Sequence, residues 1–271
     1  MMARLHIQAA ARDGITYLKQ GYGTSPFKIA NITENKKSGP LHLMLMCSSP
    51  GVLDGDDYQC KIEVLENSKL YLHTQSYQRL FNMKKGAQQS MEVHIQERAS
   101  LQYIPHPIVP HTLSVFTTRN KLYLQNNSRL LWGEILTCGR KLNGEQFGFS
   151  KFHSMTDVFV NGRLVIRENF LVQPAVTDVQ AIGQWEGYSH QASLIVVDTV
   201  AVITAINEII YNYLLPVNEI AFGISTVANA GLIIRILGHK AEQLYNCLQA
   251  IAALVNTLNT MSCKPVPVYA D

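Results

Sequence analysis

In the first 175 residues, turn-forming residues recur at short, fairly regular intervals. This pattern constrains the fold more than any other feature of the sequence. Apolar runs of strand length alternate with turn-forming pairs such as Asn67-Ser68, Lys85-Gly86 and Asn126-Asn127. Two Asn-Gly pairs, Asn143-Gly144 and Asn161-Gly162, favour the positive φ angles of tight hairpins. No fixed repeat period of the solenoid kind is present. The pattern predicts a mostly β protein of stacked or barrel-like β layers, with about eleven or more strands.

The predicted strands of this region share an apolar run bounded by turn residues. They are Leu41–Cys47, Gln59–Leu65, Leu70–Gln75, Gln89–Gln96, Leu101–Ile104, Ser114–Thr118, Lys121–Gln125, Leu130–Cys138, Gln146–His153, Thr156–Val160 and Leu164–Leu171.

The pattern changes near residue 190 to a small C-terminal α/β part. An apolar strand at Ala192–Val197 is followed by apolar residues at helical spacing from Val200 to Leu214, and Pro216 stops that helix. A hairpin with Asn229 in its turn and an amphipathic helix over about 240–260 come next. The stripe of that helix suits either the core or a partner. We therefore divide the chain into a β-rich region (1–190), a strand-helix-strand-strand-helix module (191–262) and an extended tail (263–271), packed as one unit because no linker separates them. The hairpin strands are Glu219–Thr226 and Ala230–Leu237.

Composition and charge exclude several classes of protein. Hydrophobic residues make up 47% and charged residues 16% of the 271 residues, which favours a packed globular protein over a disordered one. A net charge of +3 is too small to indicate nucleic-acid binding. The most apolar stretch, Ala192–Pro216, carries Asp198 and Glu208, so a membrane span is not expected. The first residues lack a signal-peptide core and the five cysteines form no C-x-x-C pair, so we expect a cytoplasmic protein.

Enzyme motifs give no firm assignment. The sequence contains no P-loop, no G-x-S-x-G elbow and no H-E-x-x-H helix. The run Asp54-Gly-Asp56-Asp57 starts like a calcium loop, but Leu65 stands at position twelve, so an acidic turn is the simpler interpretation. His106 and His111, held between prolines, suit a metal such as nickel, although an ordinary loop or core position is the simpler interpretation. A metal-dependent β-barrel enzyme using these two histidines therefore stays open as an alternative.

Four segments, in order, resemble the UreD or UreH family of urease accessory proteins. The Pro-Gly-Val-Leu-Asp-Gly-Asp spelling in the first is closer to the UreH branch. The resemblance covers residues 24 to 175 well and the C-terminal module only by pattern. The segments are Leu43-Met-Leu-Met-Cys-Ser-Ser-Pro-Gly-Val-Leu-Asp-Gly-Asp56, Leu72-His-Thr-Gln-Ser-Tyr-Gln-Arg-Leu-Phe81, Leu101-Gln-Tyr-Ile-Pro-His-Pro-Ile108, and Leu130-Leu-Trp-Gly-Glu-Ile-Leu-Thr-Cys-Gly-Arg140 with Gly144-Glu145-Gln-Phe147.

The resemblance implies a non-enzymatic scaffold that serves urease maturation in the cytoplasm. It implies a complex with UreF-type and UreG-type accessory proteins and with the urease apoprotein. It also implies that nickel passes transiently through a water-filled internal tunnel, without tight binding and without a nucleotide of the chain's own. No nucleic acid and no membrane partner is implied.

The same resemblance places the family's polar tunnel positions on Asp56, Gln78, Glu134 and Glu168. Carboxylates in a wet tunnel would attract a divalent cation weakly enough to let it move on. Two departures affect the predicted path: Gln78 replaces a hydroxyl residue, and Asp54 replaces a glycine. A salt bridge from Glu134 to Arg140 is an equally weighted structural alternative for that acid. A purely structural adaptor, in which the carboxylates are dispensable, is the third hypothesis for the chain.

Overall fold

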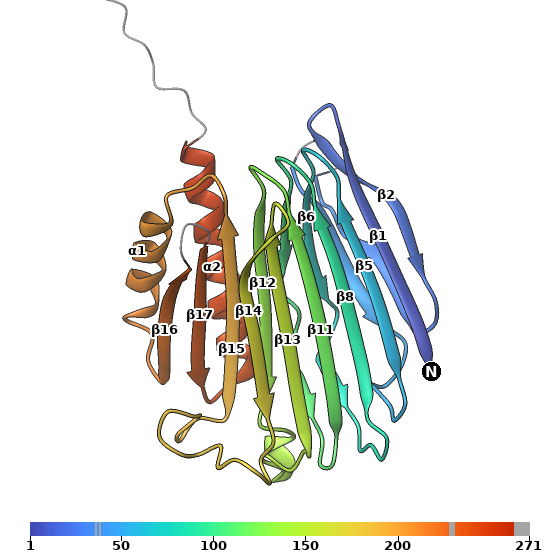
Figure 1. The fold of residues 1–271 in the computed structure, drawn as a ribbon, viewed down its shortest axis with the longest axis vertical. Helices are drawn as coiled ribbons and strands as arrows, with labels where there is room; N and C mark the ends of the chain where they lie inside the picture. The colour runs from blue at the N-terminus through green and yellow to red at the C-terminus, as the bar shows by residue number, and fades with distance from the viewer. Residues whose placement is uncertain (36, 38, 228–230, 263–271) are drawn as a thin grey trace, which may run out of the picture.

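The computed structural model of the protein describes residues 1–35, 37, 39–227 and 231–262. It confirms a mostly β fold made of two stacked sheets, with two helices in the C-terminal part (Figure 1). Sheet A runs, from one edge to the other, through β14 (Arg163–Val172), β13 (Lys151–Val160), β11 (Val115–Leu124), β8 (Ala87–Ile95), β5 (Asp57–Val64), β1 (Met2–Arg12) and β2 (Ile15–Gly23).

Sheet B lies behind sheet A in Figure 1 and extends beyond its β14 edge. Two short strands, β7 (Gln78–Leu80) and β10 (Ile108–Pro110), pair beside its main path. The main path runs through β16 (Ile220–Val227), β17 (Gly231–Gly238), β15 (His190–Asp198), β12 (Arg129–Thr137), β9 (Ser100–Tyr103), β6 (Lys69–Thr74), β4 (Leu41–Cys47) and β3 (Phe27–Asn31).

The chain passes repeatedly from one sheet to the other, so the strands at the centre of each sheet are parallel. In sheet A, Gln59 lies opposite Ser90, Ser90 opposite Arg119, and Arg119 opposite Met155. The number of residues between one strand of the sheet and the next therefore varies. This variation explains why strands that stack in register leave no fixed repeat period in the sequence.

The core between the sheets is built from inward rows of aliphatic side chains. In sheet A, Ile62, Val93, Leu122 and Val158 are opposite one another on neighbouring strands and fully buried. Sheet B supplies a facing row that includes Leu70, Leu101 and Leu130. Burying each such side chain contributes about 1.5–3 kcal/mol to folding, so these rows hold the two sheets together.

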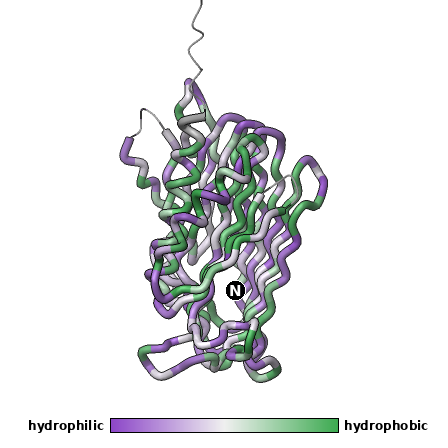
Figure 2. Tube along the Cα trace, turned by 90° about the vertical axis from the view of Figure 1, so that its left-hand side faces the viewer, coloured by the Kyte–Doolittle hydropathy of each residue, from purple (hydrophilic) through white to green (hydrophobic). Residues whose placement is uncertain are grey.

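The helices α1 (Ile203–Leu214) and α2 (Ala241–Ser262) cover the outer face of sheet B over β12, β15 and β17. Figure 2 views the molecule from the side that carries α1 and β16. In α2, Leu244, Leu248, Ile251 and Val255 are fully buried against the sheet, so the predicted apolar stripe packs in the core. Both helices and the strand before α1 lie close to their predicted positions.

Two predicted strand breaks are wrong. Ser114–Thr118 and Lys121–Gln125 belong to one strand, β11, and β13 runs unbroken through Lys151–Val160. Asn120 falls in the predicted gap between the first two segments. Asn120 instead faces the interior, where its amide donates to the hydroxyl of Thr156 at 2.9 Å.

The Asn-Gly prediction holds at one pair only. Asn161 (φ 49°) and Gly162 (φ 76°) form the hairpin between β13 and β14, as expected. Gly144 (φ 79°) instead ends a short 3-10 helix, η1 (Lys141–Asn143). The predicted turn at Asn229 and the predicted extended tail 263–271 lie outside the described residues. Within the described ranges, no helix is both long and apolar enough to cross a membrane.

Candidate functional site

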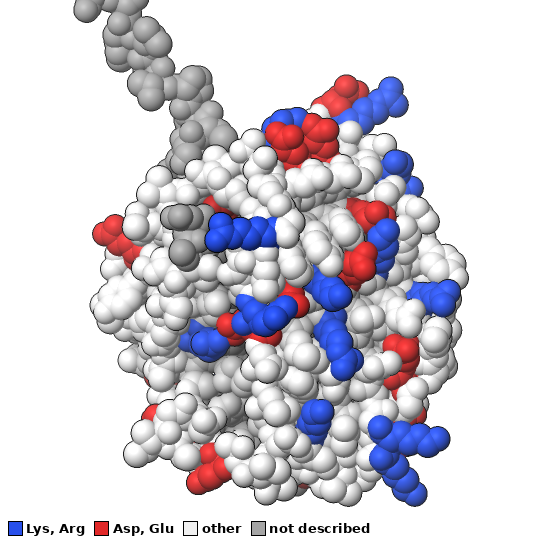
Figure 3. Space-filling model, viewed as in Figure 1, with Lys and Arg blue, Asp and Glu red and all other residues white. Residues whose placement is uncertain are grey.

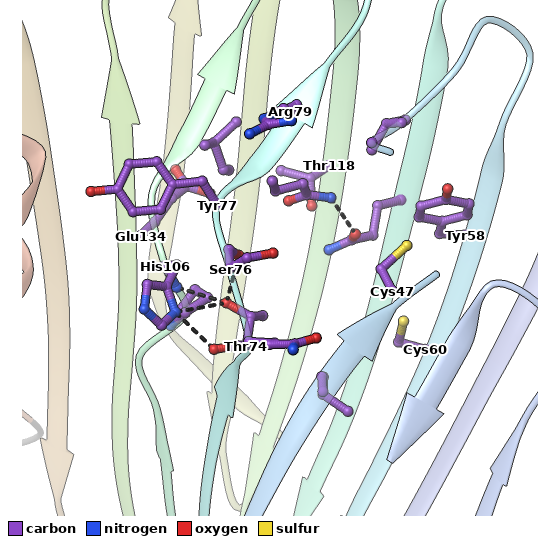
Figure 4. Close-up of a pocket in the computed structure, with 18 of the residues that line it drawn as sticks. Cys47, Tyr58, Cys60, Thr74, Ser76, Tyr77, Arg79, His106, Thr118 and Glu134 are labelled. Atoms are coloured by element: carbon purple, nitrogen blue, oxygen red, sulfur yellow. Dashed lines mark hydrogen bonds between the residues drawn. The ribbon is translucent and has the colours of Figure 1, made fainter. Parts of the chain in front are cut away.

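A cavity of about 650 Å³ interrupts the apolar core between the two sheets. Its walls include Gln78, Gln89, Thr118, Asn120 and Glu134, together with aromatic and sulfur-containing side chains. Figure 4 shows Thr118, Glu134 and the surrounding residues at this first cavity. Polar side chains inside a sandwich are costly unless they are hydrogen-bonded or hydrated, so their concentration here indicates a functional rather than a packing requirement.

Two inward rows of sheet A carry these polar groups. One row joins Tyr58, Gln89, Thr118 and Ser154 on successive strands. The next row joins Cys60, Met91, Asn120, Thr156 and Glu168, and ends on the edge strand β14. Within the rows the Thr118 hydroxyl donates to the Asn120 amide oxygen at 3.3 Å. The rows therefore contain a polar strip, hydrogen-bonded from Thr118 through Asn120 to Thr156, with Glu168 next in register.

Sheet B supplies the facing polar row. Glu134 on β12 lies opposite Ser193 on β15, and Ser193 lies opposite Arg235 on β17. The Ser154 hydroxyl of sheet A donates to the Glu134 carboxylate at 2.8 Å, which links the two sheets. Arg235 donates to the Glu168 carboxylate at the sheet edge.

A second cavity of about 30 Å³ lies between these facing rows. It shares Trp132 and Glu134 with the first cavity, so Glu134 stands in the wall common to both. Its other polar lining residues are Ser154, Thr156, Glu168, Gln191, Ser193 and Arg235. A space of this size holds about one or two water molecules, so the second cavity is the narrow part of the polar interior.

Glu134 has the most perturbed carboxyl group of the site. Burial raises its pKa, the hydrogen bond from Ser154 opposes the rise, and the nearby Glu168 carboxylate adds to it, leaving the pKa at about 7. The residue is half-buried because it borders two cavities. At neutral pH, Glu134 can therefore exchange a proton for a cation at little cost.

The structure brings four of the predicted site residues to these cavities. Gln78 and His106 line the first cavity, Glu134 lines both, and Glu168 lines the second. The predicted alternative of a Glu134–Arg140 salt bridge does not form, because Arg140 binds Glu145.

Asp56 is not among the residues that line either cavity. It is 7% exposed and accepts hydrogen bonds from the Leu53 N–H at 2.9 Å, the Tyr58 hydroxyl at 3.0 Å and the N-terminal ammonium at 2.9 Å. Burial alone would raise its pKa, but these donors hold the pKa below its usual value. Since Val52 and Tyr58 line the first cavity, Asp56 shapes the wall from behind.

His106 and His111 lie in different surroundings. The His106 ring stacks on Tyr245 of α2 at 4.6 Å and bonds the Thr74 carbonyl through Nδ1 at 2.7 Å (Figure 4 shows the Thr74 contact). His111 packs edge-on against Phe81, and its Nε2 has no hydrogen-bond partner among the described residues. Across the part of the chain that the structure describes, no group of three or more His, Cys, Asp or Glu residues is placed to hold a metal ion. The two histidines therefore give no support to the metal-enzyme alternative.

Sequence reasoning missed Thr118, Asn120, Ser154, Thr156 and Arg235. A signal for four of them was present, because β11 and β13 share one alternating pattern. Inward positions read Phe116, Thr118, Asn120, Leu122 in the first strand and Phe152, Ser154, Thr156, Val158 in the second. Paired polar residues in the middle of an inward row mark a polar interior.

Known relatives decide the family. A family model described as UreD urease accessory protein matches residues 1–267. The chain belongs to the UreD family of urease accessory proteins. The Urease accessory protein UreD of Flavobacterium johnsoniae is 46% identical over 252 residues, which cover 93% of this chain and 91% of that protein.

More distant UreD proteins match over nearly the same span. The one from Acetivibrio thermocellus is 33% identical over 259 residues (92% of this chain, 95% of that protein). The one from Haemophilus influenzae is 31% identical over 258 residues (91% and 95%). The family expected from the sequence is thereby confirmed. Its members are named as accessory proteins, so the chain is an accessory protein in urease maturation and not an enzyme.

Proposed function

We propose that this UreD protein is a scaffold and a nickel conduit, with the ion moving between the two sheets from the first cavity through the second. The polar side chains that line the two cavities, from Gln78 to Glu134 and on to Glu168, support the proposal most strongly. A scaffold alone would be better served by a fully apolar interior, because buried polar groups cost stability unless they are satisfied.

The lining fits a cation that is transferred rather than retained. Glu134 and Glu168 influence each other electrostatically, and hydroxyls of Ser154 and Thr156 stand in the same wall. Two carboxylates and neutral oxygens attract a divalent ion, but they provide fewer strong ligands than a resident site requires. Nickel is thus a transient cargo in this proposal. Glu134 releases its proton when the ion arrives and recovers it when the ion leaves.

The proposed partners are the urease apoprotein and the UreF-type and UreG-type accessory proteins. In this scheme a partner delivers nickel to the first cavity and the apoprotein receives it. The nucleotide chemistry belongs to the UreG-type partner. The cytoplasmic location stays a prediction from the sequence.

Single substitutions in the complete accessory complex test the conduit. Glu168→Ala, produced together with urease and its other accessory proteins, is expected to lower urease activity while the variant still co-purifies with its partners. Glu63→Gln is the matched control, because Glu63 lies on sheet A but binds His6 and Lys61 away from both cavities. Full urease activity with Glu168→Ala and with Glu134→Gln would favour the purely structural adaptor instead.

A further inference from the structure

The wall of the narrow second cavity includes a guanidinium group, that of Arg235. This guanidinium binds Glu168, the last residue of the inward polar row on β14. Sheet B extends past the β14 edge through β15 and β17, so Arg235 stands where the space between the sheets ends. A fixed positive charge at that point repels an approaching divalent cation.

Arg235 also lines a third cavity, of about 260 Å³, on the far side of the ion pair. The second and third cavities share Phe170, Gln191 and Arg235. Shared walls therefore link the three cavities in a series: Glu134 and Trp132 lie between the first and the second. Arg235 lies between the second and the third, together with Phe170 and Gln191. Arg235 is the only charged residue among those that line the third cavity, all of which are described.

The ion pair can open without disrupting the fold. The Arg235 side chain is 51% exposed and that of Glu168 is 20% exposed. Pairs with this much solvent contact are weak, because water replaces the lost partner on both sides. The third cavity gives the guanidinium a wet space to occupy, and no described carboxylate there would hold it.

We propose, resting on the conduit function above, that Arg235 is the gate of the nickel path. Bound to Glu168, it excludes a divalent cation from the second cavity and occupies the carboxylate that the ion needs. When it swings into the third cavity, Glu168 becomes available as a ligand and the outer end of the path opens. Arg235 thus controls access to the Glu134–Glu168 pair through its ion pair with Glu168.

Nickel titration of the purified full-length protein tests the gate. Arg235→Gln removes the competing charge, so we expect Ni²⁺ to bind at least tenfold more tightly than in the unchanged protein, measured by calorimetry at fixed pH and low salt. Arg235→Lys keeps the charge and is expected to stay near the original affinity.

Arg167→Gln is the matched control. Arg167 precedes Glu168 on the same strand, pairs with Asp157 and lines none of the three cavities. It belongs to the outer face of sheet A, where Figure 3 shows basic and acidic side chains intermixed. We expect its affinity for Ni²⁺ to stay within twofold of the unchanged protein.

Further variants separate failure of the gate from failure of the conduit. If Arg235→Gln gains no affinity while Glu134→Gln still lowers urease activation, the gate is wrong and the conduit stands. If Arg235→Gln gains affinity and adding Glu168→Gln does not remove the gain, the ion binds elsewhere and the gate is also wrong. If neither Glu134→Gln nor Glu168→Gln affects urease activation, the conduit itself fails.

Discussion

Replacing Glu134 by glutamine should stabilise the protein and impair its function. The native carboxyl has a pKa of about 7 against 4.5 for an ordinary glutamate. That difference corresponds to a penalty of about 3 kcal/mol once the pH is above 7. Glutamine keeps an oxygen that can accept the Ser154 hydroxyl but carries no charge, so it escapes this penalty.

The sign follows from proton binding. Between pH 4.5 and about 7 the native carboxyl holds a proton that the unfolded chain has released. The stability of the unchanged protein therefore falls as pH rises through this interval. Between pH 5 and pH 8 the advantage of Glu134→Gln should grow by about 2.5 kcal/mol.

Urea unfolding of the unchanged protein and of Glu134→Gln at pH 5 and pH 8 measures this change directly. The contributions of the other titrating groups cancel when the two free energies of unfolding are subtracted. Glu63→Gln is an informative control. Burial would raise the Glu63 pKa, but His6 and Lys61 hold it below its usual value, so its replacement should destabilise. An advantage of Glu134→Gln that is absent, or equal at the two pH values, would refute the reasoning about a buried, proton-binding carboxyl.

Two further substitutions probe the walls of the first cavity. Asp56→Ala leaves the Leu53 N–H and the Tyr58 hydroxyl without their acceptor and should cost about 3 kcal/mol in urea unfolding at pH 7. Because its native pKa is lowered, the stability that Asp56 contributes should be lost as pH falls below about 3.8, and an unchanged acid transition would contradict this. Asn120→Leu replaces the buried amide by an apolar group of similar size but leaves the Thr118 hydroxyl without its acceptor. We expect it to cost about 1–3 kcal/mol of stability and to lower urease activation at least tenfold in the intact complex. Normal activation by Asn120→Leu would show that the polar strip is dispensable.

Much of the fold was predictable because local chemistry decides it. Turn residues mark the strand ends, and the 3.6-residue spacing of Leu244, Leu248, Ile251 and Val255 marks α2. The two predicted strand breaks are wrong at positions where polar side chains face the interior. Asn120 and Ser154 fall in the gaps between predicted strands, and both prove to be buried once β11 and β13 are placed side by side in register.

The site was only partly predictable, because its geometry depends on pairings between distant segments. The resemblance pointed to Gln78, Glu134 and Glu168, and all three line the cavities. It also pointed to Asp56, whose role behind the wall depends on contacts with Leu53 and Tyr58 that spacing does not reveal. The meeting of Glu168 with Arg235 requires β14 of one sheet to end over β17 of the other, and no sequence pattern encodes that offset.

The nickel content of urease tests the conduit most directly. Urease would be purified from cells that produce it with its accessory proteins and with the double variant Glu134→Gln, Glu168→Gln, and its nickel would be measured by mass spectrometry. The account predicts less than a tenth of the normal nickel per active site, with the accessory complex still co-purifying at normal yield. Urease with its full nickel complement would contradict the conduit.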